Sequence, residues 1–141
     1  MDEAERAART ALLSQPHLED LARLVDRMRK EKGPNHKISD YDPLDGGINA
    51  QGLFLLEAPG RKAVSSGFVS RNNPDETAKN FFLLNKQVGI DRHRAITWNA
   101  VPWYIGSGTK IRPAKRSDVL EADRWLTEML ANLRQLRIVG L

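Results

Sequence analysis

The sequence predicts an α/β fold built on a short parallel sheet. Two short apolar runs, residues 53–56 and 95–98, each end at a polar side chain, which is typical of strands in such sheets. Helical patterns follow both runs, and a third apolar run closes the sequence. This order of strand, helix, strand, helix and strand predicts parallel strands joined by right-handed crossovers.

Two helices and a loop are expected before the first strand. Small apolar residues recur on one side of residues 2–14, and Pro16 suits the first turn of the next helix. Apolar residues then recur at helical spacing from Leu18 through Arg29, and Gly33 with Pro34 ends that helix.

The loop that follows, residues 34–52, carries two aspartates in turn-like sequences. Asp42 precedes a proline and Asp45 precedes two glycines. Both fit turn-forming roles, and a joint role near a functional site is the alternative.

The rest of the chain supplies the strands of the core and the helices between them. Strands are expected at residues 53–56, 95–98 and 136–141. The first strand is an uninterrupted apolar run, which predicts burial on both faces. Asn73 and Pro74 predict the cap and first turn of a helix that ends at Gly89. Ser117 is expected to cap the last helix, which extends to Leu133.

We expect one domain over residues 1–141, with helices in 1–33 packed on an α/β core at 50–141. Three parallel strands are few for such a sheet, and no helix follows the last strand. The fold is therefore expected to be incomplete at its C-terminus. The exposed last strand would offer an edge for self-association.

Composition narrows the classes of function. The 141 residues include no cysteine, which excludes disulfides, a cysteine nucleophile and thiolate-bound metals. Three scattered histidines predict no metal site and no cofactor. No apolar run approaches the roughly 20 residues of a membrane span, and the acidic start is unlike a secretory signal, so we expect a cytoplasmic protein without a membrane partner. A net charge of +4 favours polyanionic partners such as nucleic acid.

Three motifs occur in order and are separated by spacers of helix length. They are LEAPG at residues 56–60, the run GFVSRNN at 67–73 and TWNAVPW at 97–103. Together they resemble the uracil-DNA glycosylase superfamily, over about residues 40–141. The resemblance implies a three-layer α/β/α fold that acts on DNA containing uracil, as part of base-excision repair.

The resemblance also implies roles for individual residues. Glu57 matches the acidic residue that positions or activates the attacking water. The turn residues Ala58, Pro59 and Gly60 match the backbone that approaches the flipped base, and Phe68 matches the ring that stacks on it. Asn99 matches the asparagine whose amide reads the uracil edge.

Each of these residues also has a structural interpretation. Glu57 fits a strand-end carboxylate bonded to nearby backbone, and Phe68 fits a plain core aromatic. Asn99 fits a turn-forming asparagine, and Trp98 is expected to pack in the core.

Basic residues near the motifs are candidates for DNA contacts. Ser70 and Arg71 lie just before a helix start, which suits a phosphate, although helix capping explains them too. Lys110 and Arg112 are expected to flank the crevice, with a solvated surface as the alternative. The basic residues of 92–94 are expected to form a solvated loop.

The chain lacks the superfamily's second catalytic motif, in which a histidine stabilises charge on the uracil oxygen. We therefore expect a glycosidic hydrolase of weak or no activity in this chain. The alternative is a non-catalytic remnant of the same fold that binds DNA or a nucleobase.

Overall fold

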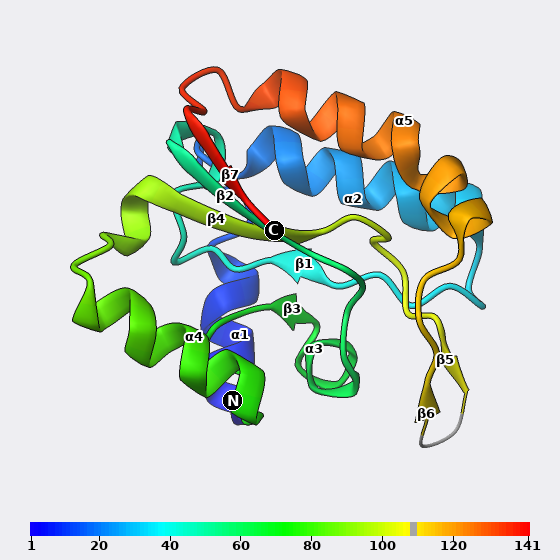
Figure 1. Cartoon of the computed structure of the whole chain (residues 1–141), viewed down its shortest axis with the longest axis horizontal. Helices are drawn as coiled ribbons and strands as arrows, with labels where there is room; N and C mark the ends of the chain where they lie inside the picture. The colour runs from blue at the N-terminus through cyan, green and yellow to red at the C-terminus, as the bar shows by residue number, and fades with distance from the viewer. Residues whose placement is uncertain (108–109) are drawn as a thin grey trace.

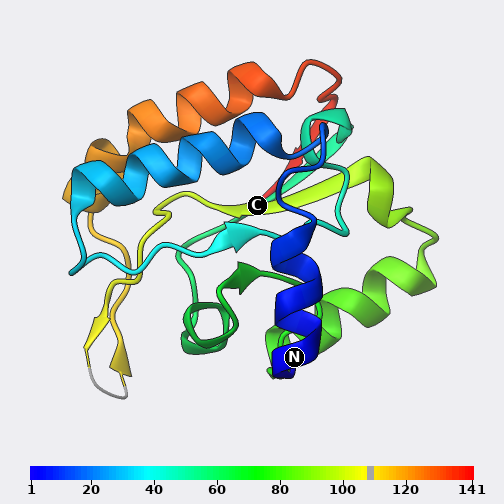
Figure 2. The ribbon, with the colours of Figure 1, turned by 180° about the vertical axis from the view of Figure 1, so that it is seen from behind.

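The computed structural model describes residues 1–107 and 110–141, which form a small α/β fold (Figures 1 and 2). The α-helices are α1 (Glu3–Ala11), α2 (Glu19–Lys32), α3 (Arg61–Ser66), α4 (Glu76–Gln87) and α5 (Arg116–Asn132), and the 3-10 helices are η1 (Gly47–Asn49) and η2 (Arg92–Arg94). The strands are β1 (Asp40–Tyr41), β2 (Gly52–Leu56), β3 (Phe68–Val69), β4 (Ala95–Asn99), β5 (Gly106–Ser107), β6 (Lys110–Ile111) and β7 (Ile138–Gly140).

The central sheet has the order β4-β2-β7, and both pairings are parallel, as the strand–helix order predicts. β2 and β4 pair in register from Gly52 opposite Ala95 to Leu56 opposite Asn99. A second parallel pair joins β1 to β3, and β5 and β6 form an antiparallel hairpin. None of these short strands was predicted, and β1 lies in the segment 34–52 that the sequence indicated as a loop, because strands of two residues leave no periodic pattern.

The hydrophobic core lies between the sheet and the helix pair α2 and α5, which run side by side across one face (Figure 1). Leu53, Ile96 and Trp98 point into it, and the indole of Trp98 stacks on the Tyr41 ring at 3.7 Å between centroids. Trp98 is thus a packing residue, as expected.

β2 is less buried than its apolar run predicts. Leu53 is buried, Phe54 and Leu55 are half-buried, and Leu56 is 39% exposed. The strand that is buried on both faces is β4, in which all five residues are buried. The prediction for residues 53–56 was therefore wrong in this respect, because an apolar run does not say how much neighbouring structure covers each face.

The starts of two helices also differ from prediction. α4 begins at Glu76 because the carboxylate of Asp75, not Asn73, caps it by accepting from the Ala78 amide at 2.9 Å. α5 begins at Arg116, one residue before the expected cap Ser117. The segment before α4 offers more than one capping residue, so local sequence leaves the choice open. At α5 the Asp118 carboxylate accepts from the Lys115 amide at 2.7 Å, which moves the start ahead of Ser117.

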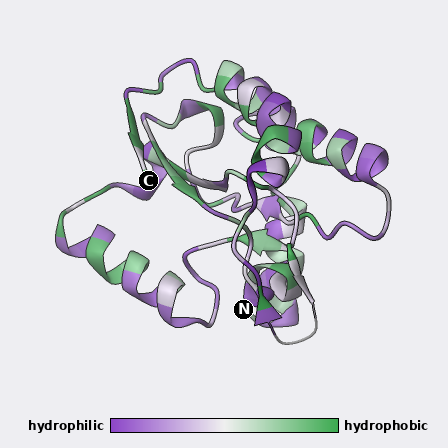
Figure 3. Ribbon diagram, turned by 45° about the vertical axis from the view of Figure 1, so that its right-hand side comes forward, coloured by the Kyte–Doolittle hydropathy of each residue, from purple (hydrophilic) through white to green (hydrophobic). Residues whose placement is uncertain are grey.

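α4 is weakly packed against the rest of the fold. Its Phe81 ring meets the Phe54 ring edge-on at 4.6 Å between centroids. Several of its other apolar side chains are exposed, and hydrophobic turns alternate with hydrophilic ones along its ribbon (Figure 3).

Ile138 of β7, an outer strand of the sheet, is also 70% exposed.

Among the described residues, no helix combines the length and apolar character needed to cross a membrane.

The burial of Leu53 in β2 predicts a large difference between two leucine truncations. Leu53→Ala removes a fully buried side chain, so we expect a loss of about 2–5 kcal/mol in the free energy of unfolding. Leu84→Ala, at a site 59% exposed, is the matched control and should change stability by no more than about 0.5 kcal/mol. Urea unfolding measures both, and equal losses would contradict the observed core.

Candidate functional site

A cavity of about 500 Å³ opens where β2 and β4 end, at their carboxyl edge. It falls within the range of about 300–1,000 Å³ that is common for ligand sites. Its lining comes from the turn after β2, the segment after β3, the first turns of α4, the end of β4, and Ile111 of β6. Ligands bind in this position in many open α/β sheets.

Glu57 and the turn Ala58, Pro59 and Gly60 line the cavity, in agreement with their expected position after the first core strand. The Glu57 side chain is exposed, and its Oε1 accepts a hydrogen bond of 2.6 Å from the Ala114 amide. Only this oxygen is bonded to a described residue, so Oε2 is free to accept from water or a ligand. Glu57 therefore fits both interpretations, because its carboxylate is hydrogen-bonded to backbone and it also lines the cavity.

Asn99 and Thr97 form the polar part of the cavity wall contributed by β4. They are two residues apart on the strand, so their side chains share one face. Asn99 is 1% exposed and Thr97 is 4% exposed. No described residue bonds to either amide atom of Asn99 or to the hydroxyl of Thr97. A buried polar group without a partner costs about 1–3 kcal/mol. Both residues line the cavity, so these atoms are candidates for contacts with a ligand.

Phe68 does not line the cavity, which overturns the expected place of its ring. It lies in β3 next to Val69, and successive side chains of a strand point to opposite faces. Val69 therefore faces the cavity, while the Phe68 ring is buried on the other side, 3% exposed. The aromatic side chain in the cavity is Phe81 of α4.

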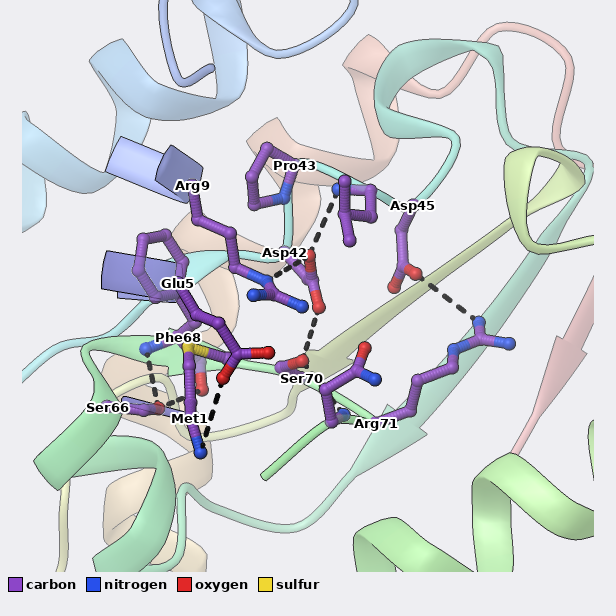
Figure 4. A network of polar contacts seen from close by, with 12 residues as sticks. Met1, Glu5, Arg9, Asp42, Pro43, Asp45, Ser66, Phe68, Ser70 and Arg71 are labelled. Atoms are coloured by element: carbon purple, nitrogen blue, oxygen red, sulfur yellow. Dashed lines mark hydrogen bonds and ion pairs between the residues drawn. The ribbon is translucent and has the colours of Figure 1, made fainter. Parts of the chain in front are cut away.

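Ser70 and Arg71 are buried, not exposed to a DNA surface as expected. The Ser70 hydroxyl donates to the Asp42 carboxylate (Figure 4). Arg71 lines the cavity and is 5% exposed. Asn73 lines it too: its amide nitrogen donates to the Phe68 carbonyl at 2.9 Å, and its Oδ1 has no partner among the described residues.

Behind this segment lies a cluster of buried charges (Figure 4). Asp42 and Asp45, each 1% exposed, contact the guanidinium groups of Arg9, Arg71 and Arg92. Arg92 was expected in a solvated loop, and the aspartates were expected to form turns. Neither interpretation included the ion pairs that join them. Burial raises the pKa of Asp45 to about 7, and the neighbouring charge of Asp42 adds to the rise against the opposing effect of Arg71 and Arg92.

Lys110 and Arg112 flank Ile111 but do not themselves line the cavity. Arg112 forms a bidentate ion pair with Asp118, at 2.6 and 2.8 Å. The Arg112 hydrogen bonds lower the pKa of Asp118 to about 2. Arg112 therefore anchors the hairpin to the start of α5, and both Arg112 and Lys110 are exposed.

Sequence reasoning missed Thr97, Asn73 and Phe81 as cavity residues. A signal for Thr97 was present, since a residue two positions before Asn99 in a strand shares its face. Asn73 was interpreted as a helix cap, and the place of Phe81 depends on how α4 packs on Phe54.

No protein-family model matches the chain, and no curated protein is significantly similar to it. Within residues 1–107 and 110–141, no three histidine or acidic side chains gather closely enough to hold a metal ion.

The unpaired hydroxyl of Thr97 predicts a stabilising substitution. Thr97→Val keeps the shape and removes a buried group that has no partner, so we expect stability to rise by about 1 kcal/mol. Thr77→Val, at an exposed threonine of the same cavity wall, is the control and should stay within about 0.5 kcal/mol. Thermal and urea unfolding measure both, and a destabilised Thr97→Val would show that the hydroxyl has a structural partner.

Asp45 predicts a pH-dependent stability. Its pKa is about 7 in the folded protein, above the ordinary value of 3.8. Between these values the folded state holds a proton that the unfolded state releases, so stability declines as the pH rises through this window. We expect Asp45→Asn to remove this part of the decline, measured by urea unfolding at about pH 5 and about pH 8. An identical pH slope in the two proteins would contradict the raised pKa.

Proposed function

We propose that the chain has a three-layer fold of the uracil-DNA glycosylase type, and that its cavity takes a uracil base flipped out of DNA. The observation that carries the proposal is the Asn99 carboxamide, which lies buried in the cavity wall with neither its donor nor its acceptor used. The three motifs at residues 56–60, 67–73 and 97–103 supply the rest of the argument.

Uracil has an edge that complements this carboxamide. A side-chain amide offers a donor beside an acceptor, and uracil offers the O4 acceptor beside the N3–H donor. Two hydrogen bonds therefore form at once, and cytosine, which reverses this pattern, is disfavoured. The Thr97 hydroxyl gives a further polar contact from the same strand face.

Glu57 supplies the carboxylate in the proposed reaction. Its free Oε2 would hold the water that attacks the sugar carbon, while Oε1 stays fixed by the Ala114 amide. The carboxylate also favours the positive charge that develops on the sugar in an oxocarbenium-like transition state. As the glycosidic bond breaks, its electron pair leaves with the uracil, which departs as an anion. The water oxygen bonds to the sugar carbon and its proton passes to the Glu57 carboxylate, so that the products are the free base and the hydroxylated sugar once the uracil anion is protonated by solvent.

The alternative proposal is binding without catalysis, and one observation favours it. The histidines His17, His36 and His93 all lie outside the cavity lining. The departing uracil anion would then lack a cationic donor from the described residues, and loss of one such group commonly costs about 100- to 1,000-fold in rate. In either case the proposed partner is DNA, and self-association through β7 remains a separate prediction.

Base reading by Asn99 is tested by ligand binding. We expect Asn99→Ala to weaken binding of deoxyuridine by about 10- to 100-fold, because two hydrogen bonds are lost. Asn80→Ala, at an exposed asparagine of α4, is the control and should bind like the unchanged protein. Titrations followed by NMR give both affinities. If Asn99→Ala binds deoxyuridine equally well, the assignment fails.

Catalysis is tested by uracil release from a single-stranded oligonucleotide that carries one deoxyuridine. We expect slow release by the unchanged chain, and about 100-fold slower release or more by Glu57→Gln, with deoxyuridine affinity retained. Binding of deoxyuridine without any uracil release would select the non-catalytic alternative. Equal release by the chain and by Glu57→Gln would exclude the proposed role of Glu57.

A further inference from the structure

Arg71 places a buried positive charge in the wall of the cavity. Its side chain is 5% exposed, and its Nε and one terminal nitrogen form no hydrogen bond with any described residue. The nearest carboxylate oxygen, on Asp45, is 3.5 Å away, which is an ion-pair distance but a poor hydrogen bond. The guanidinium also lies over the Phe81 ring, 5.2 Å from its centroid. Burying a charge with so few hydrogen bonds is costly unless another group completes them.

The charge cluster behind Arg71 does not neutralise it. Three arginines, Arg9, Arg71 and Arg92, face two carboxylates, Asp42 and Asp45, so an excess of one positive charge is left even when both carboxylates are ionised. Arg92 donates to Asp45 at 2.8 Å and also contacts Asp42. Arg92 therefore lies closer to the two carboxylates than Arg71 does. Of the three arginines, only Arg71 lines the cavity.

The charges of the cavity lining have the same balance. Arg61, Lys62 and Arg71 are positive, and Glu57 and Asp75 are negative, so the lining carries one excess positive charge. The Asp75 carboxylate is already used, because it caps α4. An anionic group beside Arg71 would restore neutrality and accept the unused guanidinium hydrogens.

We propose that Arg71 forms an anion subsite inside the cavity, which takes the phosphodiester group of the nucleotide whose base contacts Asn99. This inference rests on the proposed function, and it adds that the cavity recognises a nucleotide, not a base or nucleoside alone. Asp45 acts as a positioning residue, since its Oδ1 lies 3.5 Å from the Arg71 guanidinium. Arg92 acts through Asp45, to which it donates at 2.8 Å.

A comparison of nucleoside and nucleotide binding tests the subsite. The probes are deoxyuridine and deoxyuridine carrying a methyl phosphate on its 3′ or 5′ oxygen, with inorganic phosphate as a separate arm. We expect one of the two methyl phosphates to bind about 10- to 100-fold more tightly than deoxyuridine, because hydrogen bonds to a charged group are strong. Inorganic phosphate alone should compete with that nucleotide only weakly.

Variants of Arg71 assign the preference to this side chain. Arg71→Met should abolish the preference for the methyl phosphate, measured as the ratio of its affinity to that of deoxyuridine, whereas Arg71→Lys should keep part of it. The control is Arg94→Met, which removes an exposed arginine that bonds to Gln51 at the opposite end of β4. Circular dichroism and thermal unfolding verify that each variant is folded.

Asp45→Asn separates a binding role from a structural one. It raises the excess charge of the cluster from one to two, so the preference for the methyl phosphate should increase, measured at about pH 8 where the wild-type carboxyl is mostly ionised. A purely structural role for the cluster predicts weaker binding of every probe instead.

The outcomes distinguish this inference from the proposed function. If deoxyuridine binds through Asn99 but neither methyl phosphate binds more tightly, the anion subsite is wrong and the proposed function stands. If the preference survives in Arg71→Met, the subsite lies elsewhere and the inference is overturned. If inorganic phosphate binds through Arg71 but no uracil compound binds through Asn99, the proposed function fails and Arg71 is an anion site of another kind.

Discussion

The parallel pairing of β2 with β4 places Leu56 opposite Asn99, so the two strands end at one level of the sheet. The chain beyond each end must leave the sheet there, and the turn at Glu57 to Gly60 and the Asn99 side chain consequently meet at one cavity. A shift of one residue in this pairing would turn Thr97 and Asn99 toward the core and Trp98 toward the cavity. The burial of Trp98 against Tyr41 prevents that shift, so the packing of one strand face holds the polar groups of the other.

A second constraint acts from behind the cavity. The segment after β3 carries Ser70, Arg71 and Asn73, and each of these side chains is held by a different part of the protein. Ser70 donates to Asp42, Arg71 contacts Asp45, and Asn73 donates to the Phe68 carbonyl. Fully paired polar networks fix a conformation, whereas unpaired atoms in a network raise its cost. Arg71 and Asn73, which line the cavity, each leave atoms unpaired, and so does Asp45 behind them.

Much of the site could be predicted, and the failures have a common cause. Glu57, the turn after it and Asn99 were placed correctly because a strand end is a local feature that the apolar pattern marks. Phe68 was misplaced because the choice between Phe68 and Val69 for the cavity depends on how β3 pairs with β1, a contact with residues about 28 positions away. The role of Arg92 was missed for the same reason, since Asp42 lies 50 residues before it in the chain.

Local sequence patterns predicted the order of the three strands of the central sheet and of the long helices, the parallel sense of that sheet and the polar residues at the ends of β2 and β4. These follow from hydrophobic periodicity and turn chemistry, which act over a few neighbouring residues. Tertiary contacts set which side chains share the cavity, which oppositely charged residues are buried together and which polar atoms are left unpaired. Those properties depend on contacts between distant segments and on the exclusion of water from their surroundings, and no local pattern in the chain encodes them.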